Sequence, residues 1–199
     1  MALELNGTTG VSLVQDGVVT AADLNSTLDL TGKTLTLPSG AIASGDLPSG
    51  TIIQAVGTGG IAPNHEAVGN DTTYTSSLNN INIVCQGGTS SKFLITVYQG
   101  GSHCQADTVG QSWLERAVGA SDTQLDYSAG GGSAFHYLRH AGDANTYYPY
   151  SQIYVDTPSV SAGTTITYRG RYKRYSGSNS FYYLHTGYGY GIHVLEIAG

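Results

Sequence analysis

The chain has 199 residues and a formal net charge of −6, because 14 Asp and Glu residues outweigh 8 Lys and Arg residues. Charged residues make up 11% of it, well below the roughly 25% of ordinary soluble proteins, and Gly, Ser, Thr and Asn supply the polarity instead. The negative balance excludes nucleic acid as the main partner, because phosphate binding needs a large positive surplus.

The first 73 residues contain no aromatic side chain, and every Tyr, Phe and Trp lies from Tyr74 onward. The opening "MALELNGTTG" lacks the basic and apolar regions of a signal peptide. No stretch approaches the ~20 apolar residues of a membrane span. We therefore expect a chain that is made in a reducing cytoplasm, carries no signal peptide and does not insert into a membrane.

Short strands without a core of their own are predicted for the N-terminal segment. In "STLDLTGKTLTLPSG" a period of two surrounds a Thr-Gly-Lys turn, and its apolar members are Leu28, Leu30, Leu35 and Leu37. Because aromatic residues dominate core energetics, a segment without them is poorly suited to folding alone. We expect residues 1–48 to form an extended stalk of three copies wound together, ending in a linker over 41–50. The alternative is an ordered arm that lies on the domain or on a larger assembly.

From Thr51 onward the sequence predicts an antiparallel β-sandwich head over residues 49–199. Helical patterns are missing, and short apolar runs alternate with clusters of Gly, Ser, Asn, Asp and Pro. The predicted strands cover residues 51–56, 80–85, 92–98, 112–118, 133–140, 151–157, 164–175, 180–185 and 191–199. This number of short strands indicates an all-β fold with a jelly-roll-like sandwich.

The two cysteines, Cys85 and Cys104, lie in different predicted segments, and their spacing fits no zinc site. Two residues cannot make a disulfide scaffold. We expect two free, buried thiols, with a single bridge as the alternative.

Five stretches carry a resemblance to a known family: "LDLTGKTLTLPSG", "GTIIQAV", "TSSKFLITVY", "YVDTPSVSAGTTITYRGRY" and the final "HVLEIAG". They are similar to structural motifs of virion proteins from marine and cyanobacterial phages, which are tail-fibre or structural proteins. The resemblance covers nearly the whole chain and implies a trimeric, virion-attached protein with a β-sandwich tip. The chain departs from the family pattern in "GIAPNHEAVGNDTTYT" (60–75) and in the tyrosine-rich segment 168–191.

Metal and cofactor chemistry find little support in the sequence. The six histidines, at positions 65, 103, 136, 140, 185 and 193, show no metal-ligand spacing. His136 and His140 share a strand face but lie roughly 13 Å apart in an extended chain. The segment "NHE" (64–66) suits a solvated loop better than a cation site. We expect no metal and no cofactor.

Catalytic motifs are equally scarce. The sequence has no nucleophile elbow, no P-loop and no His-Glu-x-x-His helix. Glu115 paired with Asp126 or Asp143 leaves a glycosidase open in principle, since such enzymes need only two carboxyl groups at a suitable separation. A surface ion on a strand is the simpler interpretation of Glu115, and we expect a protein that is not an enzyme.

Four of the eight cations fall within six positions: Arg169, Arg171, Lys173 and Arg174. In "TITYRGRYKRY", strand alternation sends Ile166, Tyr168, Gly170 and Tyr172 to one face and Thr167, Arg169, Arg171 and Lys173 to the other. The segment 180–185 is predicted to pair with this strand across the "SGSNS" turn. Tyr182 or Tyr183 would then stand beside the arginines, within reach of cation–π contact.

Three interpretations of this basic and aromatic segment stay open: a saccharide site, a packing surface between subunits, and an amphipathic hairpin with its basic face in water. Two further loops combine Tyr with Gly, Ser or Pro, as adaptable recognition surfaces do. They are 139–152, with Tyr147, Tyr148 and Tyr150, and 185–191, with His185, Tyr188 and Tyr190.

Together with the resemblance, these features predict a non-enzymatic virion protein, a homotrimeric phage tail fibre or appendage. Its tip would bind host cell-surface polysaccharide by many weak contacts acting together, and its N-terminal segment would bind other virion proteins. The candidate ligand-binding residues are Tyr147, Tyr148, Tyr150, Arg169, Arg171, Lys173, Tyr182, Tyr183, His185, Tyr188 and Tyr190. The alternatives are a purely architectural capsid-decoration or tail-assembly protein, a lone carbohydrate-binding module, and a hydrolase.

Overall fold

The computed structural model describes residue 42 and residues 46–70, 72–125, 136–140 and 147–199, with the backbone alone described over 136–140. These residues belong to the second of two compact units, Ile42–Gly199. The predicted stalk residues Leu28, Leu30, Leu35 and Leu37 lie outside the described residues. The trimeric stalk therefore stays a prediction.

The described part of the chain is all-β, as predicted, with one short 3-10 helix at Gly88–Ser90 and no α-helix. Its strands are β1 (Ile52–Ile61), β2 (Glu66–Val68), β3 (Tyr74–Val84), β4 (Lys92–Cys104), β5 (Thr108–Val118), β6 (Ser121–Gln124), β7 (His136–His140), β8 (Tyr148–Asp156), β9 (Thr165–Ser176), β10 (Phe181–Leu184) and β11 (Gly189–Ile197). Each of the nine stretches predicted as strands overlaps an observed strand. Two short strands, β2 and β6, were not predicted.

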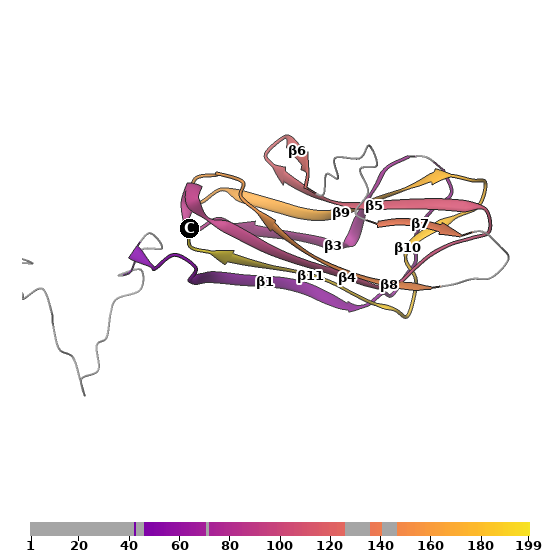
Figure 1. Ribbon diagram of the computed structural model, residues 1–199, viewed down its shortest axis with the longest axis horizontal. Coiled ribbons are helices and arrows are strands. Elements are labelled where there is room, and N and C mark those ends of the chain that lie inside the picture. Colours follow the sequence, from indigo (N-terminus) through magenta and orange to yellow (C-terminus); the bar gives the residue numbers. More distant parts are fainter. Residues whose placement is uncertain (1–41, 43–45, 71, 126–135, 141–146) are drawn as a thin grey trace, which may run out of the picture. The chain divides into compact units, whose positions relative to one another are not determined.

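The strands form two antiparallel sheets that lie face to face (Figure 1). Sheet 1 has the order β1-β11-β4-β10-β2, with β8 also paired to β4. Sheet 2 has the order β3-β9-β5-β6, with β7 also paired to β5. The chain crosses between the layers repeatedly, because β3, β5 and β9 belong to one sheet while β4, β8 and β11 belong to the other.

The predicted pairing of segment 180–185 with segment 164–175 is wrong. Strand β10 joins sheet 1, where Phe181 pairs with Cys104 and Tyr182 pairs with His103. Strand β9 instead lies between β3 and β5 in sheet 2. The turn after β9 therefore carries the chain to the other layer, because Phe181 is fully buried in the core there and would be exposed on a hairpin arm.

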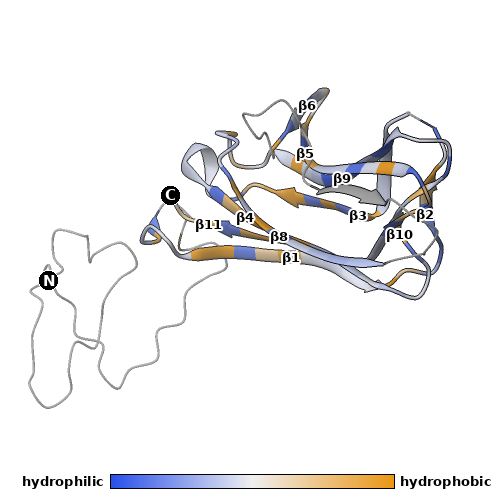
Figure 2. Cartoon of the chain, turned by 45° about the vertical axis from the view of Figure 1, so that its right-hand side comes forward, coloured by the Kyte–Doolittle hydropathy of each residue, from blue (hydrophilic) through white to orange (hydrophobic). Residues whose placement is uncertain are grey.

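The core forms where the apolar faces of the two sheets meet. Along β4, Phe93, Ile95 and Val97 point inward and are buried, and along β9 Ile166 and Tyr168 do the same, as predicted from their alternation. Apolar and polar residues alternate along the strands of both layers in Figure 2. The remaining buried members of this cluster are Ile83, Cys85, Leu114, Leu125, Ile192 and Val194.

A second apolar cluster lies around β10, at the end of the sandwich opposite the start of β1 and the last residues of β11. Its buried members are Ala62, Val68, Cys104, Tyr172, Phe181, Tyr183 and Leu184. Both cysteines are buried and neither forms a disulfide, as predicted. Burial raises the pKa of the Cys104 thiol to about 11, so it stays protonated at neutral pH.

The two ends of the sandwich are formed by different strand ends. At one end β1 begins beside the last residues of β11, where Ile52 pairs with Ile197 and the Ala198 N–H donates to the Thr51 carbonyl. At the other end β1 stops at Ile61, opposite Gly189. We call this second end, with β2, β10 and the turn from β10 to β11, the distal end.

Candidate functional site

Six aromatic and imidazole rings gather at the distal end, and we call them the His/Tyr cluster: His65, His103, Tyr147, Tyr182, His185 and Tyr188. They come from five places in the chain. One precedes β2, one lies near the end of β4, one precedes β8, one lies in β10 and two lie in the turn before β11. Only the folded chain brings these segments together.

The backbone of the β10–β11 turn is held between β4 and the end of β1. The His185 N–H donates to the Gly101 carbonyl at 3.1 Å, and the Ala62 N–H donates to the Tyr188 carbonyl at 2.8 Å. Gly187 has a φ of 86°, which favours glycine. Gly101 leaves room for the neighbouring ring, because a Cβ there would lie 2.3 Å from Cγ of Tyr188. These contacts fix where the two side chains of the turn stand.

The rings of the cluster contact one another directly. His65 meets His185 edge-on with ring centroids 4.1 Å apart, and His103 stacks on Tyr182 at 4.3 Å. Tyr147 stacks on Tyr188 at 5.0 Å and meets His103 at 4.8 Å. Centroid distances of this size are those of favourable aromatic pairs.

Exposure varies across the cluster. His103 is buried, with 3% of the residue exposed. Tyr147, Tyr182, His185 and Tyr188 are half-buried, and His65 is exposed. A ligand that contacts the cluster would therefore meet tyrosine and histidine rings whose orientation is already set by their neighbours.

Hydrogen bonds link the cluster to the backbone. The Thr186 N–H donates to Nδ1 of His65 at 3.3 Å. Nδ1 of His185 lies 3.2 Å from the Thr186 carbonyl, and its Nε2 lies 3.4 Å from the Tyr147 hydroxyl. His185 thus joins the turn to the start of β8.

The other predicted tyrosines are placed less uniformly. Tyr148 is exposed and Tyr150 half-buried on β8, and Tyr190 is half-buried at the start of β11. Tyr183 lies in the core, where its ring stacks on Tyr172 at 4.8 Å and its hydroxyl accepts from Asn79 Nδ2. Burial raises the pKa of Tyr183 above its usual range, so this hydroxyl is a structural group.

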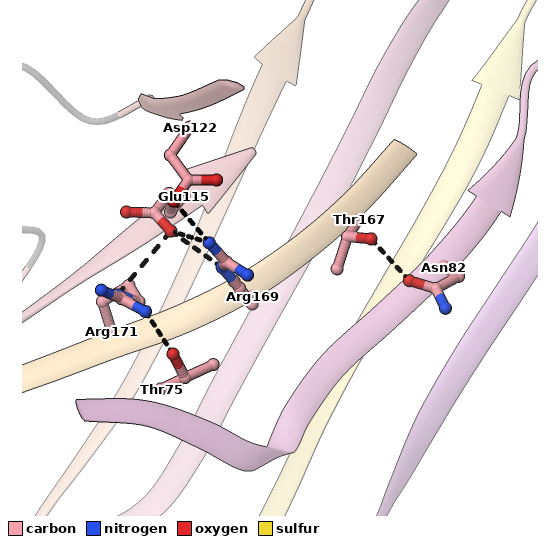
Figure 3. Close-up of polar contacts among 7 residues, drawn as sticks. All are labelled: Thr75, Asn82, Glu115, Asp122, Thr167, Arg169 and Arg171. Carbon is pink, nitrogen blue, oxygen red and sulfur yellow. Dashed lines mark hydrogen bonds and ion pairs between the residues drawn. The ribbon is translucent and has the colours of Figure 1, made fainter. Parts of the chain in front are cut away.

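The predicted basic row lies on the outer face of sheet 2, and its two arginines pair with carboxylates of the same chain (Figure 3). Arg169 contacts Glu115 of β5 at 2.7 Å and Asp122 of β6 at 2.8 Å. Arg171 lies 3.7 Å from the same Glu115 oxygen and donates to the Thr75 hydroxyl. The arginines contact carboxylates because β9 pairs with β5, which carries Glu115. The prediction that Tyr182 or Tyr183 lies beside the arginines is therefore wrong.

Lys173 completes the row and lies over the ring of Tyr175, 5.9 Å from its centroid. This is a cation–π contact within one strand. The expected surface ion at Glu115 is also wrong, since only 8% of that residue is exposed and it is held by two arginines. Its possible glycosidase partners, Asp126 and Asp143, lie outside the described residues.

In the segment "NHE", Asn64 and His65 are exposed and precede β2, as expected of a solvated loop, but Glu66 is not part of that loop. Glu66 begins β2, is buried, and accepts hydrogen bonds from the Ser76 hydroxyl at 2.6 Å and from the Ser77 backbone at 2.6 Å. His65 enters the His/Tyr cluster. Sequence reasoning missed both His65 and His103, because no local pattern connects residues that meet only through sheet pairing.

Two further kinds of site were tested against the geometry. Among the residues that the structure describes, no group of three or more His, Cys, Asp or Glu side chains is arranged to hold a metal ion. No helix in the described ranges is long and apolar enough to cross a membrane.

Comparisons with known proteins give no family. No model of a known protein family matches the sequence, and no curated protein matches it. A structure of the Gx strain of infectious bursal disease virus is 10% identical with a TM-score of 0.38, over 73% of this chain and 32% of the viral chain. The VP2 subviral particle of that virus is 10% identical with a TM-score of 0.29, over 73% of this chain and 41% of the other.

A non-viral structure matches at a comparable level. Eiger TNF from S. frugiperda is 8% identical with a TM-score of 0.27, over 72% of this chain and 93% of the other. Likenesses at these TM-scores assign no function. The chain spans about a third of the first viral structure that it matches.

Proposed function

We propose that this chain is a virion structural protein, a phage tail fibre or appendage, whose β-sandwich head binds host cell-surface polysaccharide at its distal end. The observation that carries the proposal is the partly exposed His/Tyr cluster. It lies at the end of the sandwich opposite the one where β1 begins and β11 finishes. Aromatic rings held in place by their neighbours suit stacking on sugar rings, because little entropy is lost on binding.

The strand order supports a virion role. Sheet 1 holds β1, β11, β4 and β8 while sheet 2 holds β3, β9, β5 and β7, and this interleaving is that of two nested Greek keys. We infer a jelly roll, an arrangement used by viral capsid proteins and by lectins. The sequence resemblance to phage virion proteins supports the same role. On this proposal the protein is non-enzymatic, acts as a homotrimer, and belongs to the virion.

Glycan binding by the full-length protein tests the proposal. We expect signals on an array of bacterial surface polysaccharides, and we expect Tyr147→Ala and Tyr188→Ala each to weaken them about two- to tenfold, the loss that corresponds to one aromatic contact. Tyr175→Ala is the matched control, because Tyr175 is exposed on β9 and lies outside the cluster. Blank arrays together with blank pull-downs of host cells would remove receptor binding from the proposal.

A purely architectural role is the second candidate, and one observation favours it. The outer face of sheet 1 carries exposed apolar side chains, among them Ile52, Ile153 and Val155. Such a face suits contact with other subunits more than contact with water. Loss of assembly without any glycan signal would select this candidate.

A further inference from the structure

The His/Tyr cluster contains three imidazoles and, as far as the described residues show, no carboxylate in contact with His65 or His185. From this we propose that the cluster binds an acidic saccharide, one that carries carboxylate or sulfate groups, and takes up a proton from solvent when it binds. The inference rests on the proposed function, and it names the ligand class and the pH dependence of the same site.

The hydrogen bonds define which ring nitrogens carry protons when the cluster is neutral. Nδ1 of His65 accepts the Thr186 N–H, so the proton of the neutral ring is on Nε2. Nδ1 of His185 faces the Thr186 carbonyl and must donate to it, which leaves Nε2 to accept from the Tyr147 hydroxyl. In this state His185 uses both nitrogens, while His65 keeps one N–H donor on an exposed ring.

The groups that face these imidazoles from each packed segment are few. The rings are His65 from before β2, His103 from β4, Tyr147 from before β8, Tyr182 from β10, and His185 and Tyr188 from the turn, and Glu66 is the charged residue next to His65 in the chain. Glu66 is the one carboxylate among them, and both its oxygens are occupied by Ser76, Ser77 and Leu78. The Glu66 carboxylate is therefore held by hydrogen bonds to β3 and does not act as a counter-ion for the histidines.

A proton taken up by His65 or His185 consequently has no counter-ion among these groups. The rings of His65 and His185 lie 4.1 Å apart, centroid to centroid, so a single anion can reach both. An anion placed over their exposed side attracts a positive charge on either ring and accepts the Nε2–H of His65, the ring N–H that the internal hydrogen bonds leave unused. Binding of the anion and uptake of the proton then favour each other, as linkage requires.

The tyrosines supply the remaining recognition of a sugar. Tyr147 and Tyr188 stack nearly parallel, at 22°, beside His185, and Tyr182 stands next to both His65 and His103. A pyranose ring lying on one of these tyrosines would bring its acidic group to the imidazoles. A neutral sugar gains the stacking alone, so its binding stays independent of pH over the range in which imidazoles titrate.

Calorimetric titration of the full-length protein tests the inference, with a uronic-acid oligosaccharide (oligogalacturonate) and a neutral oligosaccharide of equal length as probes. We expect the affinity for oligogalacturonate to rise about tenfold or more between pH 7.5 and pH 5.5, with net proton uptake seen as a dependence of the heat on the buffer. We expect binding of the neutral probe to be weaker at pH 5.5 and nearly constant with pH.

Substitutions separate the cluster from the rest of the surface. His65→Gln and His185→Gln should each remove most of the pH dependence while leaving residual stacking. His193→Gln is the matched control, because His193 is exposed on β11 and belongs to sheet 1 outside the cluster. The thermal unfolding midpoint of each variant checks that it folds, and the exposed ring of His65 makes its substitution the safer of the two.

The outcomes decide between this inference and the broader function. The inference is overturned if the two probes bind with equal affinity, if no proton is taken up, or if oligogalacturonate binds at neither pH. It is also overturned if His193→Gln loses as much of the pH dependence as the cluster variants. If a neutral glycan still binds and Tyr188→Ala weakens it, the proposed function stands without the acidic ligand. If no glycan binds under any condition, both fail.

Discussion

At the scale of the residue, Glu196 shows how this fold handles a buried charge. The carboxylate is fully buried in β11, and it accepts the backbone N–H groups of Gln86 and Gly87 and the hydroxyl of Ser91. Gln54 of β1 donates to it as well. Burial by itself would raise the pKa of Glu196, but these hydrogen bonds outweigh burial and hold the pKa below its usual value. The ionised side chain thus ties the β3–β4 connection to the end of the sandwich where β1 begins.

Replacing this carboxylate should cost stability in a pH-dependent way. Because folding lowers the pKa of Glu196, its ionised form stabilises the fold above the unfolded-chain pKa of about 4.3, and this contribution is lost as the pH falls through the lower folded-state value. We expect Glu196→Gln to lower the free energy of unfolding by about 2 kcal/mol near pH 7 and by much less near pH 3. Urea unfolding of parent and variant at both pH values measures this, and a difference that does not change with pH would contradict the account.

At the scale of the element, close packing between layers determines where β10 can lie. Phe181 of β10 is fully buried against Gly110 of β5, which belongs to the other sheet. A Cβ at Gly110 would lie 2.1 Å from a carbon of the Phe181 ring, so only glycine leaves room for it. The packing of the distal end therefore depends on the absence of a side chain at Gly110 of β5. This absence makes room for β10, the strand that carries Tyr182 of the His/Tyr cluster.

Gly110→Ala should disturb the distal end more than the rest of the sandwich. We expect a loss of about 1–3 kcal/mol in the free energy of unfolding, the usual cost of overpacking a core, together with weaker glycan binding. Gly60→Ala is the control, since its Cβ would have no atom nearer than 3.7 Å. Thermal and urea unfolding of the two variants provide the comparison, and equal stability would show that β10 can shift without penalty.

At the scale of the whole molecule, the two outer faces of the described sandwich differ in chemistry. Sheet 2 presents charged side chains that pair among themselves, with Arg169 and Arg171 against Glu115. Sheet 1 presents apolar side chains such as Ile153 and Val155, and the outward-facing residues of β1, β4, β8 and β11 include no Asp or Glu. In a chain with a net charge of −6, a face without carboxylates is where identical copies repel each other least.

Self-association of the chain should depend on this face and on the N-terminal segment. We expect light scattering to show a trimer for the full-length protein, and we expect Ile153→Asp or removal of residues 1–48 to shift it toward monomer. Val84→Asp is the control, because Val84 is also exposed but lies on sheet 2. A monomer in the unmodified protein would contradict the fibre model and leave a single sandwich module.

Much of the fold could be predicted from local sequence. The strands of 92–98 and 164–175 were predicted from alternation, and the inward positions of Ile166, Tyr168 and Tyr172 followed from it. Successive side chains of an extended segment point to opposite faces whatever the strand pairs with. The short strands β2 and β6 were missed because "EAV" and "SDTQ" are too short, or too polar, to show a pattern.

The candidate site was predicted only in part. Tyr147, His185 and Tyr188 were named from Tyr-rich loops and Tyr182 from the predicted strand 180–185. These four do meet, but His65 and His103 were not named as ligand residues. The basic row was found correctly on one strand face, while its partners, Glu115 and Asp122, were not. The sequence of a strand determines which side chains share a face, but it does not determine which other strands lie next to it in the sheet.

The sequence alone predicted the all-β class, the positions of most strands and the faces on which the side chains of the 164–175 strand lie, because these depend on local geometry and composition. Only the tertiary structure decided that β10 joins β4, that three histidines converge at the distal end and that the arginines are neutralised. These outcomes depend on which distant segments bury their apolar faces together, and that choice is made by the packing of the whole sandwich.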